Sequence, residues 1–331
     1  MKADAIRAIA DAVLYEGYIL WPYRRSALKN QRRFTFGGVY PPGHSARHPD
    51  DPSTMRIGVL LLAEPETRVT ATLRFLHVVR RTAARRRGNA LEPVDELTVG
   101  EQRYLSWEEV TERELALPAL SLERLRARQH QRIHIAGGRI VEPLDAGAGA
   151  LIRTWKPLAG ELLLEAAELE DRVWRVSVVI RNTTPFGLED RQQALEQTMC
   201  STHTLLHAPR GTFVSLADPP PQLAAAAAGC RNVGCWPVPV GEPGDHSTML
   251  CSPIILEDYP KIAPESPGDL FDGGEIDQLL ILNILTLTDE EKAEMAASDP
   301  RAAEILRRTE ALTPEQLMSL HGSIREFGMA R

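Results

Sequence analysis

Apolar residues repeat at helical spacing in two parts of the first half of the chain. In residues 3–15 they recur every three or four positions, so one face of a short helix is apolar. Ser106 and Glu109 have the spacing of a capping box, in which a hydroxyl caps the helix start and a carboxylate follows three residues later. These patterns predict helices over residues 3–15 and 107–115.

Alternation of apolar and polar residues, which is typical of strands, covers more of this half. Residues 68–80 alternate clearly, and residues 55–63 are a second strand candidate. The turn-forming stretch at residues 64–67 predicts that the two strands form a hairpin. A further strand pattern at residues 132–141 is broken by a turn at Gly137-Gly138. One face of the 68–80 strand consists of Val69, Ala71, Leu73 and Phe75.

The second half contains the clearest strand pair, at residues 161–170 and 173–182, with a turn at residues 171–172. Strands and helices do not alternate behind a glycine-rich phosphate loop, as they would in a parallel α/β sheet. We therefore predict an α+β fold, mostly antiparallel β, with two sandwich-like or curved-sheet domains and short C-terminal helices. Additional strands are predicted at residues 213–216, 236–240 and 253–256.

Composition divides the chain into four predicted segments. Residues 145–150 are small and flexible, which predicts a boundary between an N-terminal β-rich domain with its helix and a second antiparallel β domain. Residues 257–275 are acidic and proline-rich and have few apolar anchors, so we expect an extended arm over another domain or subunit. The predicted segments are residues 1–145, 151–256, 257–287 (the arm and an apolar segment) and 288–331.

Capping residues predict three short helices after residue 288. Thr288 opens a capping box with Glu291. Asp299 and Thr313 each precede a proline, which is favoured at the first helical position.

The charge balance argues against a general nucleic-acid binder. The chain has 331 residues, of which 43% are hydrophobic and 25% charged, and its formal net charge is −7. Residues 80–87 are an exception with five arginines, a composition suited to an acidic partner or RNA. We favour the interpretation that this run is a solvated loop between two strands.

The sequence indicates a cytoplasmic protein. No stretch reaches the roughly 18 apolar residues of a membrane span, and the first residues lead into an amphipathic segment without a signal-peptide core. In that compartment the four cysteines are expected to be reduced thiols.

The most distinctive composition lies in residues 15–41, which we call the aromatic segment. Four of the six tyrosines fall here, interleaved with arginine, glycine and proline. Tyrosine, tryptophan and arginine combine a large contact area with few rotatable bonds, so the segment predicts a recognition surface or a packed rim. The candidate binding residues are Tyr15, Tyr18, Trp21, Tyr23, Arg24, Arg25, Lys29, Asn30 and Tyr40.

Cysteine and histidine offer a possible zinc or iron site. Such sites need ligands that converge from close-spaced pairs, and here only Cys230 and Cys235 are close in sequence. Buried, apolar cysteines are therefore our first expectation. The histidine pairs at spacing four, which include His44 and His48, lack the glutamate of a zinc-protease helix, and we expect those two to be exposed. The candidate ligands are Cys200, Cys230, Cys235, Cys251 and His203, with His207 and His246 as further possibilities.

Catalytic motifs are not apparent, so the sequence favours a non-catalytic protein without excluding an enzyme. There is no Gly-x-Ser-x-Gly elbow, and the Gly-Gly pairs are better explained as turns. The acidic residues around Gly273 lack the spacing of a calcium-binding EF-hand.

Several strings resemble an uncharacterised protein family associated with the gene clusters of high-affinity, actinobacterial-type nickel–iron hydrogenases. They are YEGYILWPY and SALKN in the aromatic segment, and SPIIL, APESPGDLFD and EID between residues 252 and 277. The resemblance implies an accessory role, as a maturation, assembly or structural partner of the hydrogenase, but no activity.

Three hypotheses about function follow. The first is a non-catalytic accessory protein that binds hydrogenase subunits or maturation factors. The second is a metal-binding protein or metalloenzyme that uses the four cysteines and nearby histidines. The third is a structural protein that assembles with itself into a homo-oligomer.

Overall fold

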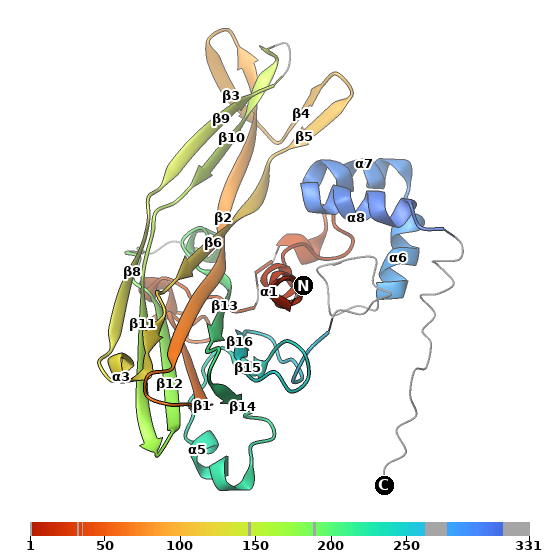
Figure 1. Cartoon of the computed structure of the whole chain (residues 1–331). Coiled ribbons are helices and arrows are strands. Elements are labelled where there is room, and N and C mark those ends of the chain that lie inside the picture. The colour runs from red at the N-terminus through yellow and green to blue at the C-terminus, as the bar shows by residue number, and fades with distance from the viewer. Residues whose placement is uncertain are drawn as a thin grey trace.

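Antiparallel sheets dominate the structure, a computed structural model that describes residues 2–31, 33–34, 36–144, 147–187, 190–261 and 277–313. Strands cover more of the described residues than helices do. The sheets are open, and short helices follow them near the C-terminus, which confirms the predicted fold class. Figure 1 shows two sheets, with α1 and the C-terminal helices gathered on one side of them.

Five strands form the smaller of the two main sheets, in which all pairs are antiparallel. The strand pair predicted at residues 161–170 and 173–182 lies within this sheet and is confirmed by the structure. The order is β14 (Thr212–Val214), β1 (Thr54–Leu62), β12 (Val173–Asn182), β11 (Leu158–Glu170) and β8 (Gln129–Ile135).

Nine strands form the larger sheet, which is built around the 20-residue strand β2 (Arg68–Arg87). The main order is β15 (Trp236–Pro239), β16 (Thr248–Ser252), β13 (Cys200–His207), β2, β10 (Gly149–Trp155) and β9 (Gly138–Pro143). Three more strands pair with β2, namely β3 (Ala90–Val94), β6 (Trp107–Ala116) and β7 (Leu120–Ser121). A separate hairpin consists of β4 (Glu96–Val99) and β5 (Gln102–Leu105).

Helices are short apart from α1 (Lys2–Tyr15), which confirms the predicted N-terminal helix. The C-terminal ones are α6 (Asp277–Leu285), α7 (Asp289–Ser298) and α8 (Pro300–Glu310). The others are η1 (Leu28–Gln31), α2 (Pro42–Ser45), α3 (Leu122–Leu125), α4 (Arg191–Leu195), η3 (Pro221–Leu223) and α5 (Ala224–Ala228). In the part of the chain that is described, no helix is long and apolar enough to cross a membrane.

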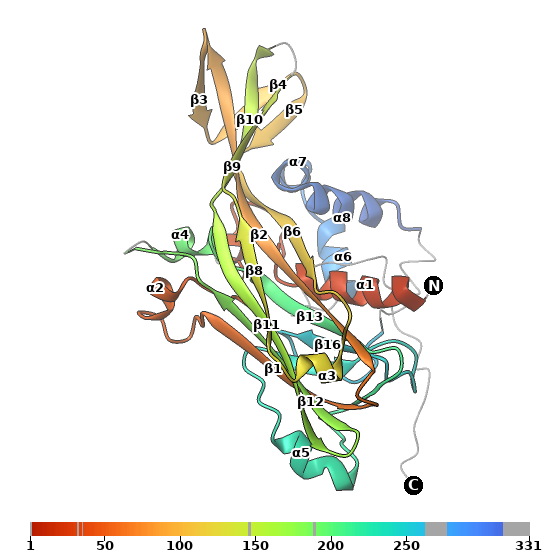
Figure 2. The same cartoon turned by 60° about the vertical axis from the view of Figure 1, so that its left-hand side comes forward.

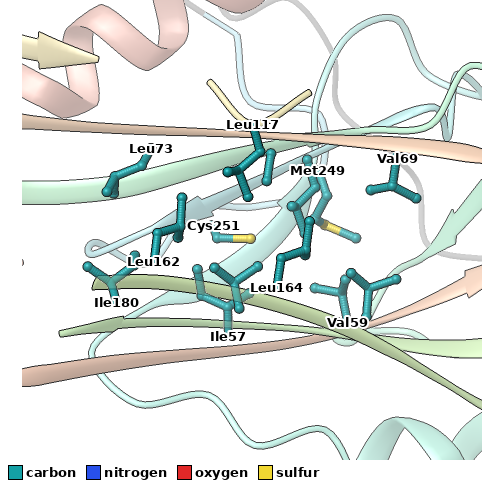
Figure 3. Packing of buried hydrophobic residues seen from close by; sticks show 14 of the residues in the cluster. Ile57, Val59, Val69, Leu73, Leu117, Leu162, Leu164, Ile180, Met249 and Cys251 are labelled. Carbon is teal, nitrogen blue, oxygen red and sulfur yellow. The ribbon is translucent and has the colours of Figure 1, made fainter. Parts of the chain in front are cut away.

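The main hydrophobic core lies between the two sheets, as Figure 3 shows. The predicted apolar face of β2 points into it, because Val69, Ala71, Leu73 and Phe75 are all buried there. Facing them are Ile57 and Val59 of β1, Leu162 and Leu164 of β11, and Ile180 of β12. A second core lies between β2, β6, the aromatic segment and helices α6–α8.

The predicted hairpin of residues 55–80 is wrong, because β1 and β2 belong to different sheets. The edges of β1 are occupied by β12 and β14, whereas β2 pairs with β13, β6 and β10. The five-residue link, residues 63–67, therefore crosses between the two layers of the sandwich. Alternation identified both strands but carries no information about which strand lies beside which.

The predicted helix over residues 107–115 is also wrong, since these residues form strand β6. This strand pairs with β2 along its whole length, from Trp107 opposite Arg81 to Ala116 opposite Thr72. The Ser106 hydroxyl does not cap a helix. It accepts a hydrogen bond from the Ala83 backbone N–H and donates one to the Val94 carbonyl oxygen. Tertiary pairing has thus overridden the local helix signal.

Strands from both sides of the predicted boundary at residues 145–150 share the same sheets. β10 begins at Gly149 and pairs with β2, and β1 pairs with β12. Residues 1–145 and 151–256 therefore share one core between the sheets. Residues 145 and 146 lie outside the described part of the chain. The strand expected at residues 253–256 lies earlier, as β16.

Two of the three predicted C-terminal helices are confirmed by their caps. Thr288 and Glu291 form the predicted capping box at the start of α7, and the Asp299 side chain caps α8 ahead of Pro300. The third helix, predicted beyond Thr313, falls on residues that the structure does not describe. The same holds for residues 262–275 of the arm that was predicted at residues 257–275.

The far end of β2 extends beyond the body of the protein together with β3, β9, β10 and the β4–β5 hairpin (Figures 1 and 2). This projection has its own small core, which includes Ala83, Leu97, Leu144 and Leu151. The basic run at residues 80–87 is part of this strand, so the interpretation as a loop was wrong.

Replacing Ser106 by alanine tests its role between strands. We expect Ser106→Ala to lower the free energy of unfolding by about 1–2 kcal/mol, because two backbone groups lose their hydrogen-bond partner. Urea denaturation would measure the change. The exposed Ser26→Ala is the control and should alter stability by less than about 0.5 kcal/mol. Equal effects of the two substitutions would contradict this role.

Candidate functional site

The tyrosines of the aromatic segment are buried, which matches the packed rim rather than an exposed recognition surface. Tyr15, Tyr18, Tyr23 and Tyr40 are each at most 5% exposed. They belong to the second core, which also contains Leu280, Ile281, Met295 and Ile305 of helices α6–α8. The segment therefore contacts the C-terminal helices of its own chain. Of the other candidates, Asn30 is buried, Trp21, Arg24 and Arg25 are partly buried, and Lys29 is exposed.

Asn30 holds the aromatic segment in its folded shape. Its side-chain oxygen accepts a hydrogen bond from the Leu20 N–H at 2.8 Å, and its amide nitrogen donates to the carbonyl oxygens of Leu20 and Arg24. The side chain thus bridges a turn of about ten residues from within, which explains why it is buried.

The turn between α7 and α8 is held by polar contacts with this segment. The Tyr18 hydroxyl donates to Asp299 Oδ2 at 2.5 Å, and the Arg25 backbone N–H donates to the Ser298 hydroxyl at 3.3 Å. Arg24 forms an ion pair with Glu291 at 2.9 Å. Burial and the neighbouring Asp299 raise the pKa of Tyr18, so its hydroxyl stays a donor.

Arg81 of β2 connects the sheet to the same turn. Its guanidinium donates to the carbonyl oxygens of Ala297 and Ser298, where α7 ends, and to the carbonyl oxygen of Leu105. It also pairs with Glu109 at 2.9 Å. A cation at the C-terminal end of a helix satisfies free carbonyl groups and interacts favourably with the helix dipole.

A charged network joins the N-terminal helix to the sheet and to α8. The buried Arg74 of β2 lies 2.6 Å from Asp11 of α1 and 3.4 Å from Glu112 of β6. Arg301 of α8 lies 3.5 Å from Glu112, and its guanidinium stacks 3.7 Å above the ring of Tyr15. Four elements that are distant in sequence therefore meet at one ion-pair cluster.

Beside the α7–α8 turn lies a cavity of about 690 Å³, which we call the arginine pocket. It is bounded by the aromatic segment, β2, β3, β6 and α4. The lining includes four arginines and two carboxylates, together with apolar surface. The described lining residues are Arg25, Asn30, Arg33, Phe34, Arg80, Arg81, Thr82, Pro93, Val94, Asp95, Ser106, Trp107, Glu108, Gln192 and Leu195.

Arg33 forms one wall of this pocket and is almost fully buried. Its guanidinium stacks 3.9 Å above the ring of Trp107 and donates to the carbonyl oxygens of Tyr18 and Glu108. Burial lowers the pKa of Arg33, although nearby groups counteract part of this effect. The arginine remains a cation because the reference pKa of the group is far above neutrality.

The pocket combines residues that sequence reasoning selected with others that it missed. Arg25 and Asn30 were among the candidate binding residues. Trp107 and Glu108 were assigned to a helix, and Arg80 and Arg81 to a solvated loop. Arg33 belongs to the aromatic segment, but its sequence neighbours do not distinguish it from the other arginines. The signal that could have identified Arg80 and Arg81 is their position at the end of a long apolar alternation.

The candidate metal ligands do not converge on one point, although Cys235 and Cys251 are neighbours. Cys200 lies in the second core, Cys235 and Cys251 in the main core, and Cys230 at the edge of a third cluster. Burial raises the pKa of the Cys200 and Cys235 thiols to about 12, and it also raises those of Cys230 and Cys251. Within the described ranges, no group of three or more histidine, cysteine or acidic residues is arranged to hold a metal ion.

The histidines differ from the expectation at one position. His44 is buried, not exposed, because its ring stacks between Tyr40 and His48, and its Nε2 lies 2.8 Å from Asp51 Oδ2. His48 is exposed as expected. His203 is fully buried, and its Nδ1 lies 3.1 Å from the Ser201 carbonyl oxygen.

The arrangement of the arginine pocket suits binding of an anionic group. Its cations come from three separate places in the sequence, and its described lining contains no histidine or cysteine to act as a base or nucleophile.

Comparison with known proteins adds no family, since a scan against protein-family models found no match and a search of curated proteins found none either.

Replacing Arg81 by methionine tests the link between the sheet and the α7–α8 turn. Arg81→Met should lower the free energy of unfolding by about 2–3 kcal/mol, because three carbonyl groups lose a charged donor, while Glu109 keeps its contact with Arg153. Amide hydrogen exchange should become faster in α7 and α8 but stay unchanged in β11 and β12. Arg87→Met, at an exposed ion pair, is the matched control and should cost less than about 1 kcal/mol. Uniform loss of protection in helices and sheets would contradict the local role of Arg81.

Acidification should destabilise the fold through His203. Burial, with a smaller contribution from Arg74, lowers the pKa of His203 to about 4, below the value of about 6.5 expected when unfolded. The unfolded chain therefore binds the proton first, and stability is lost as pH falls through this window. Between pH 7 and pH 5 the wild type should lose about 2 kcal/mol more than His203→Asn. Urea denaturation at both pH values measures the difference. The exposed His134→Asn should retain the wild-type slope, and a wild-type slope in His203→Asn would refute the assignment.

Proposed function

We propose that this protein is a non-catalytic accessory protein of a nickel–iron hydrogenase system, and that it acts in the cytoplasm by binding another protein. In this proposal its partner is a hydrogenase subunit or maturation factor. The site that takes part is the arginine pocket with the adjoining aromatic segment.

The lining of the arginine pocket is the observation that supports binding most directly. Its four guanidinium groups are held by stacking, ion pairs and hydrogen bonds to the chain itself. Such preorganised cations bind anionic groups at a low entropic cost.

The link to hydrogenase rests on the resemblance of the strings in residues 15–30 and 252–277. One of these strings, SALKN at residues 26–30, overlaps the residues that line the pocket, because Asn30 belongs to it and Arg25 directly precedes it. A structural role and a binding role therefore meet in the same part of the chain under this proposal.

Affinity purification from the native host tests the proposal. The tagged protein should co-purify with hydrogenase subunits or their maturation proteins, identified by mass spectrometry, and a tagged unrelated protein of similar size should not. Recovery of further copies of this chain alone would support the self-assembly hypothesis instead. If hydrogenase components are recovered equally with the unrelated protein, the proposed partner is wrong.

A further inference from the structure

Each of the four arginines that line the pocket has a carboxylate within ion-pair distance. The partners are Asp95 for Arg25, Glu108 for Arg33, Glu196 for Arg80 and Glu109 for Arg81. Glu108 lies 3.6 Å from Arg33, and its other oxygen accepts a hydrogen bond from Gln192. Which arginine can take a new anionic partner therefore depends on its exposure and on how easily its present partner is exchanged.

Two of the four guanidinium groups are accessible to a ligand. The side chain of Arg25 is 35% exposed and that of Arg80 is 52% exposed. Arg81 and Arg33 are almost fully buried and serve as walls. A guanidinium has five N–H donors, and Arg80 uses one nitrogen to contact Glu196. Both accessible arginines can therefore donate hydrogen bonds to a further oxygen atom.

The ion pair of Arg25 is of a kind that another carboxylate can replace. Its partner Asp95 has a side chain that is 92% exposed, and the closest N–O distance is 3.5 Å. An exposed pair at this distance contributes little free energy, so its exchange costs little. A carboxylate that enters the pocket would meet a cation already fixed in direction by its hydrogen bond to the Asp95 carbonyl oxygen.

The remaining surface of the pocket is apolar. Phe34, Pro93, Val94, Trp107 and Leu195 line it beside the arginines. A free inorganic anion would contact only the arginines. A carboxylate with an apolar side chain beside it would contact both the arginines and the apolar surface. The cavity of about 690 Å³ lies within the range of about 300–1,000 Å³ that is typical of ligand clefts.

We propose that the arginine pocket binds a carboxylate of an extended peptide segment, with Arg25 and Arg80 as its direct ligands and an adjacent apolar side chain packed against Pro93 and Val94, the more exposed of the apolar lining residues. The inference rests on the proposed function and names the chemistry that the partner protein presents. The carboxylate is that of a glutamate or aspartate side chain or of a chain terminus.

Isothermal titration calorimetry on the full chain tests this assignment. The probe is the capped peptide acetyl-Leu-Glu-Glu-Leu-amide, and its glutamine analogue and free glutarate are the comparisons. The acidic peptide should bind, with an affinity that falls as salt rises, and the glutamine analogue and glutarate should each bind about tenfold more weakly or not at all. Binding of the glutamine analogue as tightly as the acidic peptide would overturn the carboxylate. Equal binding of glutarate would overturn the peptide and assign the pocket to small dicarboxylates.

Substitutions locate the site. Arg25→Gln should weaken peptide binding about tenfold, and Arg80→Gln should do the same if its thermal midpoint shows that it folds. Arg25 is the safer variant because its partner Asp95 is exposed, whereas Glu196 is buried. Arg87→Gln, on the same strand and 67% exposed, is the control and should bind as the wild type does. Unchanged binding in Arg25→Gln would overturn the site.

The two proposals can fail independently. If tagged Arg25→Gln still recovers hydrogenase components as the wild type does, the pocket assignment is wrong and the proposed function stands. If the wild type binds the acidic peptide but recovers no hydrogenase component, the proposed partner is wrong and the carboxylate site stands.

Discussion

Backbone hydrogen bonding along β2 is the interaction on which the rest of the structure depends. Its first half pairs with β13 on one edge and with β6 on the other, and its second half pairs with β10 and β3. One continuous strand therefore belongs both to the sandwich and to the projection beyond it. It also carries Arg74 into the ion-pair cluster with α1, Arg80 to Glu196, and Arg81 to the place where α7 meets α8.

Parts of the fold could be predicted where local and tertiary preferences agree. The β11–β12 hairpin has both strand pattern and turn, and the caps at Thr288 and Asp299 depend on residues within one helical turn. Residues 107–115 show the opposite case, since the Ser106 hydroxyl satisfies backbone groups of two neighbouring strands rather than its own helix. The β1–β2 pairing failed for another reason. Period-two alternation reveals a strand, whereas its partner depends on the whole sheet.

The residue types of the candidate site could be predicted from the sequence, but the burial of its side chains could not. Two of the candidate binding residues in the aromatic segment, Arg25 and Asn30, line the pocket. Whether its tyrosines face solvent is decided by residues 280–306, which belong to the same core and lie at least 240 positions away in sequence. Composition alone cannot reveal such a distant cover. Nor can it separate Arg33, which is buried against Trp107, from Lys29, which is exposed.

The backbone and the side chain of Arg25 contact different parts of the protein, and this has a thermodynamic consequence. Its backbone N–H holds Ser298 at the α7–α8 turn, while its guanidinium lines the pocket on the other side. A ligand in the pocket that changed, through Arg25, the free energy of docking of α7 and α8 would have its own binding free energy changed by the same amount when these helices dock. The reason is that linkage between two equilibria is reciprocal. A ligand of the pocket would therefore report, through its affinity, whether α7 and α8 are docked against the first thirty residues.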